Sequence, residues 1–331
     1  MRDWPKIVAI GGGTGLSTLL RGLKNYPVHL SAVVTMTDNG QSSGRISRSA
    51  GTLPPGDVRK CLTALATDET LLSELFEYRF KNVRGLNGHS LGNLLLLALT
   101  DITGNFEKAI EATSRILSVK GRVLPSSLEP ANIIGHLKNG HTALGETEIP
   151  VMGHRYGLSS ISLMPEKIKA NPAAIDMICQ ADLVIIGPGS LYTSLVPNFL
   201  IKEIRKAVED CSVKKVFIVN SSTERGETEN YSVENHVEEL NKYVSVKDFS
   251  AIIVNDNVVS KNGSREGLLG HIKNITTDAD TIMGVPVIAT DVINEQRPLF
   301  HDPKKLASVI FTLLSEPQKL AIKKAEKAEV V

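Results

Sequence analysis

Residues 6–35 of the 331-residue chain, KIVAIGGGTGLSTLLRGLKNYPVHLSAVVT, decide the fold class. The β-branched run at 6–10 predicts a short buried strand, and it stops at a five-residue turn that holds four glycines. A second apolar run follows at 30–35, and between the two runs four leucines recur with helical spacing, Leu16, Leu19, Leu20 and Leu23. This order of strand, turn, helix and strand is typical of a parallel sheet with right-handed crossovers.

Later segments continue this pattern. Short apolar strands are predicted at 183–186, 215–220 and 251–254, and helices at 57–80 (as a pair), 89–100, 105–119 and 303–314. The very apolar helix at 89–100 is expected to be central, residues 36–55 are expected to form a long loop, and 122–144 predicts short antiparallel strands around the turn Lys138-Asn139-Gly140. We therefore expect one α/β domain over residues 1–331, with a mostly parallel sheet, helices on both faces, a small antiparallel insertion at about 120–165 and a C-terminal tail at about 315–331.

The composition is that of an ordinary globular protein, with 42% hydrophobic residues and 37 basic against 36 acidic side chains. The resulting net charge of +1 argues against a nucleic-acid partner. The three cysteines, Cys61, Cys179 and Cys211, are too far apart in sequence to indicate a disulfide framework or a zinc cluster, and they fit a reducing compartment. No export signal or membrane-spanning segment is predicted, so we expect a cytoplasmic protein.

The turn Gly11-Gly12-Gly13-Thr14-Gly15 is the first candidate ligand site. Glycines let a ligand approach the backbone closely, and the start of the next helix offers N–H groups and a positive dipole end, which suit a phosphate. The spacing matches neither the dinucleotide fingerprint, because Leu16 stands at the sixth position, nor a P-loop, because the lysine is missing. The alternative is a tight turn that binds nothing.

The loop that follows the second strand is the next candidate. In a doubly wound sheet this strand ends beside the glycine turn. Asp38 could hold a ribose hydroxyl or a metal, and the hydroxyls and the guanidinium that follow it could contact phosphate oxygens. The alternative is a solvated turn. The candidate binding residues of this loop are Asp38, Asn39, Ser42, Ser43 and Arg45.

Two predicted helix starts carry further polar residues. Asp57 and Arg59 follow a Pro-Pro-Gly stop, and there the capping of the helix by Asp57 is an equal alternative to ligand binding. The second start opens the very apolar helix, and polar groups buried at that point would need a protein partner or a ligand. Its three polar residues lie within about one turn, His89, Ser90 and Asn93.

Two more strands end in polar loops. The carboxyl ends of parallel strands share one edge of the sheet, so these loops indicate a site more strongly together than separately. The alternative for each is ordinary loop chemistry. The residues expected to contact phosphate or sugar oxygens are Gly187, Gly189, Ser190 and Tyr192 after the strand at 183–186, and Asn220 and Arg225 after the next strand.

Five motifs in this order resemble the YvcK branch of the CofD-like family, whose members are labelled gluconeogenesis factors. The motifs lie at 10–16, 38–45, 54–59, 88–93 and 186–194, and the resemblance runs from about residue 5 to about residue 315. It implies a modified Rossmann-like α/β fold. It also implies UDP-sugar binding and a role in cell shape and envelope synthesis during growth on gluconeogenic carbon. The other branch of the family holds the 2-phospho-L-lactate transferases, which use a divalent metal to build a deazaflavin cofactor.

Three hypotheses about function follow from the residues and the resemblance. The first is a regulator that binds a UDP-sugar, with the pyrophosphate on residues 11–15, helped by hydroxyls such as Ser190, and with the uridine and sugar near Asp38, His89, Asn93 and Asn220. The second is a Mg²⁺-dependent transferase of a phosphoryl-bearing group, with Asp38 and Asp57 as metal ligands. The third is a dinucleotide binder without hydride chemistry. A homodimer is possible in each case.

One departure from the resemblance bears on the metal. Many members of the YvcK branch carry a second aspartate at the position of Asn39. The amide at this position weakens any metal site that needs two carboxylates. We therefore expect nucleotide binding to depend little on Mg²⁺.

Overall fold

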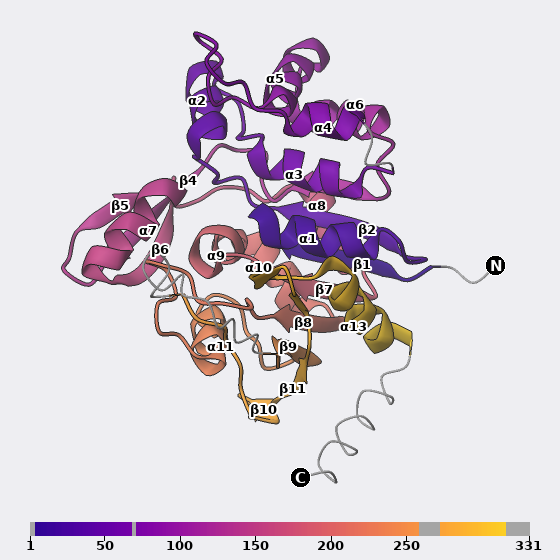
Figure 1. The fold of residues 1–331 in the computed structure, drawn as a ribbon, viewed down its shortest axis with the longest axis vertical. Coiled ribbons are helices and arrows are strands. Elements are labelled where there is room, and N and C mark those ends of the chain that lie inside the picture. Colours follow the sequence, from indigo (N-terminus) through magenta and orange to yellow (C-terminus); the bar gives the residue numbers. More distant parts are fainter. Residues whose placement is uncertain (1–3, 68–70, 258–271, 316–331) are drawn as a thin grey trace.

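An eight-stranded sheet forms the centre of the computed structural model, which describes residues 4–67, 71–257 and 272–315 (Figure 1). Seven of its strands are mutually parallel, and β10 alone runs antiparallel to its neighbour β11. In spatial order the strands are β10 (Thr281–Ile282), β11 (Val285–Thr290), β9 (Ala251–Asn255), β8 (Lys214–Ile218), β7 (Leu183–Ile186), β1 (Lys6–Gly11), β2 (His29–Val34) and β3 (Arg122–Pro125).

The strand order reverses between β1 and β7. The chain first builds outward from β1 to β2 and β3, and it later restarts at β7, on the other side of β1, and builds toward β8 and β9. Ile10 near the end of β1 pairs with Val33 of β2 and with Ile186 of β7, so the carboxyl ends of the three strands lie side by side. Such a reversal leaves a crevice at the carboxyl edge, where ligands bind in open α/β sheets.

Helices cover both faces of the sheet, as the sequence predicts. Alternate residues of β1 point to opposite faces, so that Ile7 and Ala9 belong to one apolar core and Val8 and Ile10 to the other. The first core is closed by α1 (Gly13–Leu23), α3 (Gly56–Leu65) and α13 (Pro303–Ser315). The second is closed by α8 (Pro172–Cys179), α9 (Val196–Leu200), α10 (Lys202–Asp210) and α11 (Val233–Asn241).

A helical layer lies above α3 at the top of Figure 1. It consists of α2 (Gln41–Ala50), α4 (Leu71–Glu77), α5 (Leu91–Thr103) and α6 (Phe106–Ile116). Two predictions are wrong here. Residues 36–55 are not one long loop, because α2 occupies the middle of this segment. The leucine-rich α5 is not central, because only Gly92, Asn93 and Leu96 of it are buried and the side chain of Ile102 is 78% exposed.

The predicted antiparallel element is a separate three-stranded sheet of order β5-β4-β6. Its strands are β4 (Asn132–Leu137), β5 (Thr142–Leu144) and β6 (Leu158–Met164), and α7 (Gly145–Tyr156) packs on them. The expectation of antiparallel strands over all of 122–144 is wrong for β3, because this strand pairs in parallel with β2 and forms the edge of the main sheet. A short hairpin, β12 (Ile293–Asn294) and β13 (Arg297–His301), precedes α13, and the predicted tail after Ser315 lies outside the described residues.

Candidate functional site

The glycine turn closes directly onto the loop after β7. Gly11 ends β1 and α1 begins at Gly13, whose φ of +64° is in the left-handed region that favours glycine. A Cβ atom on Gly15 would lie 2.5 Å from the carbonyl oxygen of Pro188, so only a glycine lets the two loops touch. The predicted glycine turn and the predicted 187–190 loop therefore form one continuous rim at the strand-order reversal.

A cavity of about 420 Å³ opens at this rim, at the carboxyl ends of β1, β7 and β8. Eight of the residues predicted from sequence line it, namely Gly12, Gly13, Thr14, Gly15, Gly189, Ser190, Asn220 and Arg225. The side-chain amide oxygen of Asn220 accepts a hydrogen bond from the backbone N–H of Gly189 at 3.0 Å, which ties the β8 loop to the β7 loop. The other residues around the cavity include Thr18, Lys60, Glu146, Ser194, Glu224, Glu227 and His301.

Asp57 reaches the glycine turn instead of capping its own helix. Its Oδ2 atom accepts a hydrogen bond from the N–H of Gly13 at 2.7 Å, and its Oδ1 atom accepts one from Nζ of Lys60 at 2.9 Å. The residue at the cap of α3 is Pro55, so the capping interpretation of Asp57 is wrong. Burial raises the pKa of Asp57, the nearby charge of Lys60 opposes the rise, and the nearby carboxylate of Asp38 adds to it.

Lys60 lies among several carboxylates. Burial lowers its pKa, but the charges of Asp57, Asp38 and Glu146 outweigh burial, and the pKa ends above its ordinary value. Glu146 enters the cavity wall from the start of α7, and burial followed by the charges of Asp57 and Asp38 raises its pKa well above the usual range. Lys60 therefore stays protonated and is the cation of this group.

The same group does not fit a resident Mg²⁺ ion. Both oxygens of Asp57 already accept hydrogen bonds, and Oδ1 of Asp38 accepts one from the N–H of Gly40 at 2.8 Å. Lys60 lies where a divalent cation would have to balance the carboxylates. Within the part of the chain that the structure describes, no three His, Cys, Asp or Glu side chains are arranged as metal ligands.

A second group of predicted residues forms a buried network in the helical layer. Ser42 contacts Nδ1 of His89 at 3.2 Å and accepts a hydrogen bond from Nδ2 of Asn93 at 3.0 Å. The Oδ1 atom of Asn93 accepts one from Nε of Arg59 at 3.0 Å, and Ser43 is 3.5 Å from Nδ2 of Asn93. These four polar links join α2, α3 and α5 and satisfy one another.

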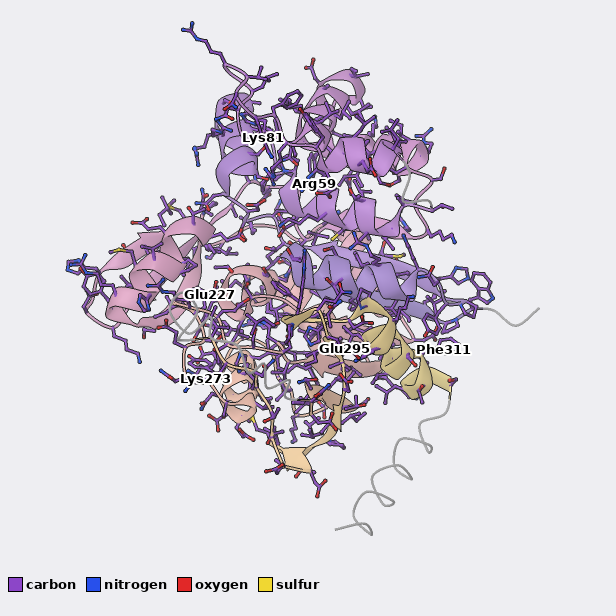
Figure 2. The ribbon with its side chains drawn as sticks, in the orientation of Figure 1. Arg59, Lys81, Glu227, Lys273, Glu295 and Phe311 are labelled. Atoms are coloured by element: carbon purple, nitrogen blue, oxygen red, sulfur yellow. The ribbon has the colours of Figure 1, made fainter. Side chains whose placement is uncertain are left out.

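The ends of this network are also occupied by protein groups. Arg59 is only 2% exposed and forms an ion pair with Glu77, while Ser90 caps α5 by accepting a hydrogen bond from the N–H of Asn93. Burial, followed by the charge of Arg45, lowers the pKa of His89. Figure 2 shows Arg59 among the helices at the top and Glu227 lower, toward the α7 side. The residues of this network do not line the cavity, and neither do Asp38 and Asp57.

Three further predicted residues also contact protein groups. The Oδ1 atom of Asn39 accepts a hydrogen bond from the N–H of Thr147 at the start of α7, at 3.3 Å. Arg45 donates to the carbonyl oxygen of Asn87 at 2.7 Å. The ring of Tyr192 is buried in the second core, where its hydroxyl is 2.8 Å from that of Tyr231.

Two glutamates of the β8 loop, Glu224 and Glu227, line the cavity although they are not among the residues predicted to bind a ligand. Glu227 accepts hydrogen bonds from the N–H groups of Tyr192 and Thr193, both at 3.2 Å, and from the hydroxyl of Thr193 at 2.9 Å. Burial raises its pKa to about 7, against the effect of those bonds. Glu224 accepts a hydrogen bond from Ser190 at 3.0 Å, and burial followed by the charge of Glu227 raises its pKa to about 8.

Two other missed residues come from distant segments. Glu146 belongs to the insertion, and His301 ends β13, where burial lowers its pKa to about 4. Neither residue stands in a local motif, so only the fold reveals that they share a cavity. Lys60 directly follows the motif at 54–59, and Glu224 and Glu227 lie within two residues of Arg225. Their neighbours in the sequence could therefore have identified these three residues as candidates.

A larger hollow, of about 840 Å³, lies at the opposite edge of the sheet, near the amino ends of β1 and β2. Helix α1 ends there, and Nζ of Lys24 donates to the carbonyl oxygen of Ala66 at 2.8 Å. Basic residues are ordinary at the negative ends of helices, so their presence needs no ligand. The carboxyl edge, with its helix N-terminus and convergent loops, is the candidate site.

Comparison with known proteins assigns this architecture to a family. A family model described as 2-phospho-L-lactate transferase CofD matches residues 7–293. A gluconeogenesis factor from Bacillus subtilis is 41% identical over 319 residues, which cover 96% of this chain and 100% of that protein. Another from Halalkalibacterium halodurans is 38% identical and covers 92% of this chain and 95% of that protein.

A solved structure extends the similarity to the fold. The crystal structure of a UPF0052-family protein from Bacillus halodurans superposes with a TM-score of 0.88 at 37% identity, covering 94% of this chain and 100% of that one. The resemblance indicated by the five sequence motifs is therefore confirmed over most of the chain. Among the described helices, none is long and apolar enough to cross a membrane.

Proposed function

Since the chain belongs to the CofD family and matches gluconeogenesis factors along most of its length, we propose that it is a cytoplasmic regulator that binds a UDP-sugar. In this proposal ligand binding couples the supply of nucleotide sugar to cell shape and envelope synthesis during growth on gluconeogenic carbon. The regulatory role is carried over from the branch of the family that the five motifs resemble. The UDP-sugar is implied by the same resemblance, and the lining of the cavity supports a ligand that carries phosphates and polar groups.

The observation that carries the proposal is the start of α1 at the rim of the cavity. The first N–H groups of a helix have no partner within it, and together with the helix dipole they attract an anion. Gly12, Gly13, Thr14 and Gly15 form this wall, and of the N–H groups at the helix start that of Gly13 already donates to Asp57. A pyrophosphate would rest on this turn, with Lys60 and Arg225 as cations in the cavity wall.

The size and lining of the cavity support a nucleotide sugar over a simple phosphate. About 420 Å³ falls within the usual range of small-molecule sites, which is roughly 300–1,000 Å³. Beyond the glycine turn the walls carry hydroxyl, amide and carboxyl groups from the β8 loop, among them Asn220, Ser222 and Thr223. Groups of this kind bind uncharged polar ligands, as the ribose and sugar of a nucleotide sugar are.

The second candidate is a transferase of a phosphoryl-bearing group, as in the other branch of the family. The observation that favours it is the number of ionisable side chains near the glycine turn, where Asp57, Glu146 and Lys60 meet. A dinucleotide would bind to the same glycine turn. The proposal also includes a homodimer, but it assigns no surface to the dimer contact.

Two measurements test the proposal. Calorimetry should show saturable binding of UDP-glucose, with a Kd in the micromolar range or weaker, and no binding would refute the ligand class. Incubation of the protein with UDP-glucose and Mg²⁺ for hours should return the ligand intact. Release of UDP or UMP at a rate that falls in Asp38→Ala or Asp57→Asn would make the chain an enzyme and favour the transferase.

A further inference from the structure

Two polar atoms in the cavity wall are buried and have no hydrogen-bond partner among the described residues. They are Oε2 of Glu224 and Nε2 of His301. Both residues line the cavity that holds the glycine turn, and they come from the β8 loop and from the end of β13. Buried polar atoms are nearly always paired, so an unpaired pair in one cavity points to a ligand that supplies the missing partners.

The hydrogen bonds that Glu224 and His301 already make determine which ligand groups can pair with Oε2 and Nε2. The imidazole of His301 is bonded to the carbonyl oxygen of Val219, and since Nε2 is unpaired the donor must be Nδ1. Burial lowers the pKa of His301 to about 4, so the ring is neutral near pH 7 and Nε2 carries a lone pair. The Nε2 atom therefore accepts a hydrogen bond and cannot donate one.

Glu224 offers a matching group. Its Oε1 atom accepts a hydrogen bond from the hydroxyl of Ser190 at 3.0 Å, and Oε2 is buried without a partner among the described residues. Burial raises its pKa to about 8, so the carboxyl group is available in both protonation states near neutral pH. A ligand hydroxyl suits either state, because it both donates and accepts hydrogen bonds. A phosphate would be repelled by the ionised form and offers Nε2 of His301 no proton.

We propose that Glu224 and His301 form a hydroxyl-recognition subsite that binds the sugar of the ligand and makes the cavity prefer a nucleotide sugar over the nucleoside diphosphate alone. The inference rests on the proposed function, and it assigns the sugar to the β8 side of the cavity and the phosphates to the α1 side. It also replaces His89 and Asn93 as sugar contacts, because those residues bond to Ser42 and Arg59 in the helical layer. The selectivity arises because a ligand without a sugar leaves both buried atoms unpaired.

The test compares the affinities for UDP-glucose and UDP, measured by calorimetry on the same protein. Two variants remove the proposed bonds. His301→Asn places an amide N–H near the position of Nδ1 and removes Nε2, while Glu224→Ala removes both carboxyl oxygens, because a glutamine amide could still hydrogen-bond a ligand hydroxyl. Glu295→Ala is the matched control for loss of one glutamate side chain, because the side chain of Glu295 is 79% exposed at the surface. Thermal melting checks that each variant folds.

The wild type and the control should bind UDP-glucose about tenfold or more tighter than UDP. In each subsite variant this preference should fall to about threefold or less, and the affinity for UDP should change by less than about twofold. The inference is overturned if both variants keep the wild-type preference, or if they weaken UDP as much as UDP-glucose. If the wild type binds neither ligand, the proposed function itself fails, and a wild type that binds both equally refutes only the subsite.

Discussion

The N–H of Gly13 donates a 2.7 Å hydrogen bond to the carboxylate of Asp57, so the residue that opens α1, the proposed phosphate site, already contacts an acidic group of the protein. Asp57 is 2% exposed and comes from α3, which joins the glycine turn to the helical layer. Lys60, on the same helix, binds the other oxygen of the carboxylate. A bound phosphate therefore adds a second negative charge beside Asp57 and must share Lys60 with it.

Asp57→Asn should strengthen nucleotide binding. The amide oxygen can still accept the hydrogen bond from Gly13, while the negative charge beside the phosphates is lost and Lys60 is released toward the ligand. We expect the Kd for UDP without added metal to fall by about three- to tenfold, which corresponds to roughly 0.7–1.4 kcal/mol. Calorimetry in the presence of a chelator measures it. Weaker binding in the variant would mean that Asp57 contacts the ligand directly as an acceptor.

Gly13→Asp should abolish binding of UDP and UDP-glucose, because the new carboxylate would project from the wall on which the phosphates rest. Gly51→Asp is a closely matched control. Both glycines have a φ of +64°, so the backbone strain of the substitution is the same, but Gly51 ends α2 and a Cβ atom there meets nothing within 4 Å. The control should bind like the wild type. Undiminished binding in Gly13→Asp would remove the glycine turn from the site.

The parallel sheet could be predicted because its strands are short apolar runs without alternation. All four residues of β7, Leu183–Ile186, are buried, as expected of a strand covered by helices on both faces. Helix α2 could not be predicted in the same way. Its sequence, QSSGRISRSA, holds serines, arginines and a glycine, and the side chains that it buries are those of Ile46 and the polar Ser42 and Ser43 rather than an apolar stripe.

The misplaced helix shows the limit of composition as a guide. Six leucines in α5 predict a core position, but the helix lies at the outer side of the helical layer, where it packs mainly on α6 and α4 and fully buries only Gly92, Asn93 and Leu96. The sequence carries no information on how many neighbours a helix meets. The sequence predicts ligand contacts for the polar residues at its start, Ser90 and Asn93; both are buried and hydrogen-bond to protein groups.

The cavity residues also fall into those that the sequence predicts and those that it does not. The glycine turn and Asn220 could be predicted because each directly follows an apolar strand, and the parallel sheet brings such loops to one edge. Glu146 and His301 could not, because they reach the cavity from the insertion and from β13. Asn39 was expected at the ligand, but its side chain occupies the space over Gly145 at the start of α7.

Gly22→Ala should destabilise the protein, although replacing a glycine inside a helix by alanine usually stabilises it. A Cβ atom at position 22 would lie 2.0 Å from the carbonyl oxygen of Pro303 and 2.8 Å from Cβ of Ala307, so α13 would have to move away from α1. We expect the free energy of unfolding in urea to fall by about 1–3 kcal/mol. The exposed substitution Lys108→Ala should change it by less than about 0.5 kcal/mol. An unchanged midpoint in Gly22→Ala would show that α13 is not packed on α1 as described.

Two buried histidines predict a loss of stability in acid. Burial lowers the pKa values of His236 and His301 to about 4, from an ordinary value of 6.5. Above pH 6.5 neither the folded nor the unfolded chain protonates them. As the pH falls from 6.5 toward 4 the unfolded chain takes up the protons first, so folding becomes less favourable. Each histidine can account for about 3 kcal/mol over this range.

His236→Asn isolates one of these contributions, since the buried Glu224 and Glu227, with raised pKa values, change stability in the opposite direction in both proteins. The asparagine amide can replace Nδ1 in its 2.7 Å contact with the carbonyl oxygen of Ser232. Between pH 7 and pH 4, the free energy of unfolding in urea should fall by about 3 kcal/mol less in the variant than in the wild type. Parallel losses in the two proteins would mean that His236 is protonated in the folded state.

Removal of metal should affect nucleotide binding little, because Lys60 already neutralises the carboxylates at the glycine turn. Both carboxylate oxygens of Asp57 already accept hydrogen bonds, from Gly13 and Lys60, and Asn39 carries an amide that bonds to α7. These two residues therefore do not supply a pair of free carboxylates for Mg²⁺ beside the phosphates. We expect a chelator to weaken UDP binding by less than about tenfold, or ~1.4 kcal/mol. Lys60→Ala should reverse this behaviour and make binding dependent on Mg²⁺, since the carboxylates would then lack their cation. A larger loss of UDP affinity in the wild type, if Mg²⁺ restores it and Asp38→Ala does not show it, would mean that a metal ion bound by Asp38 holds the phosphates. That result would favour the transferase over the regulator.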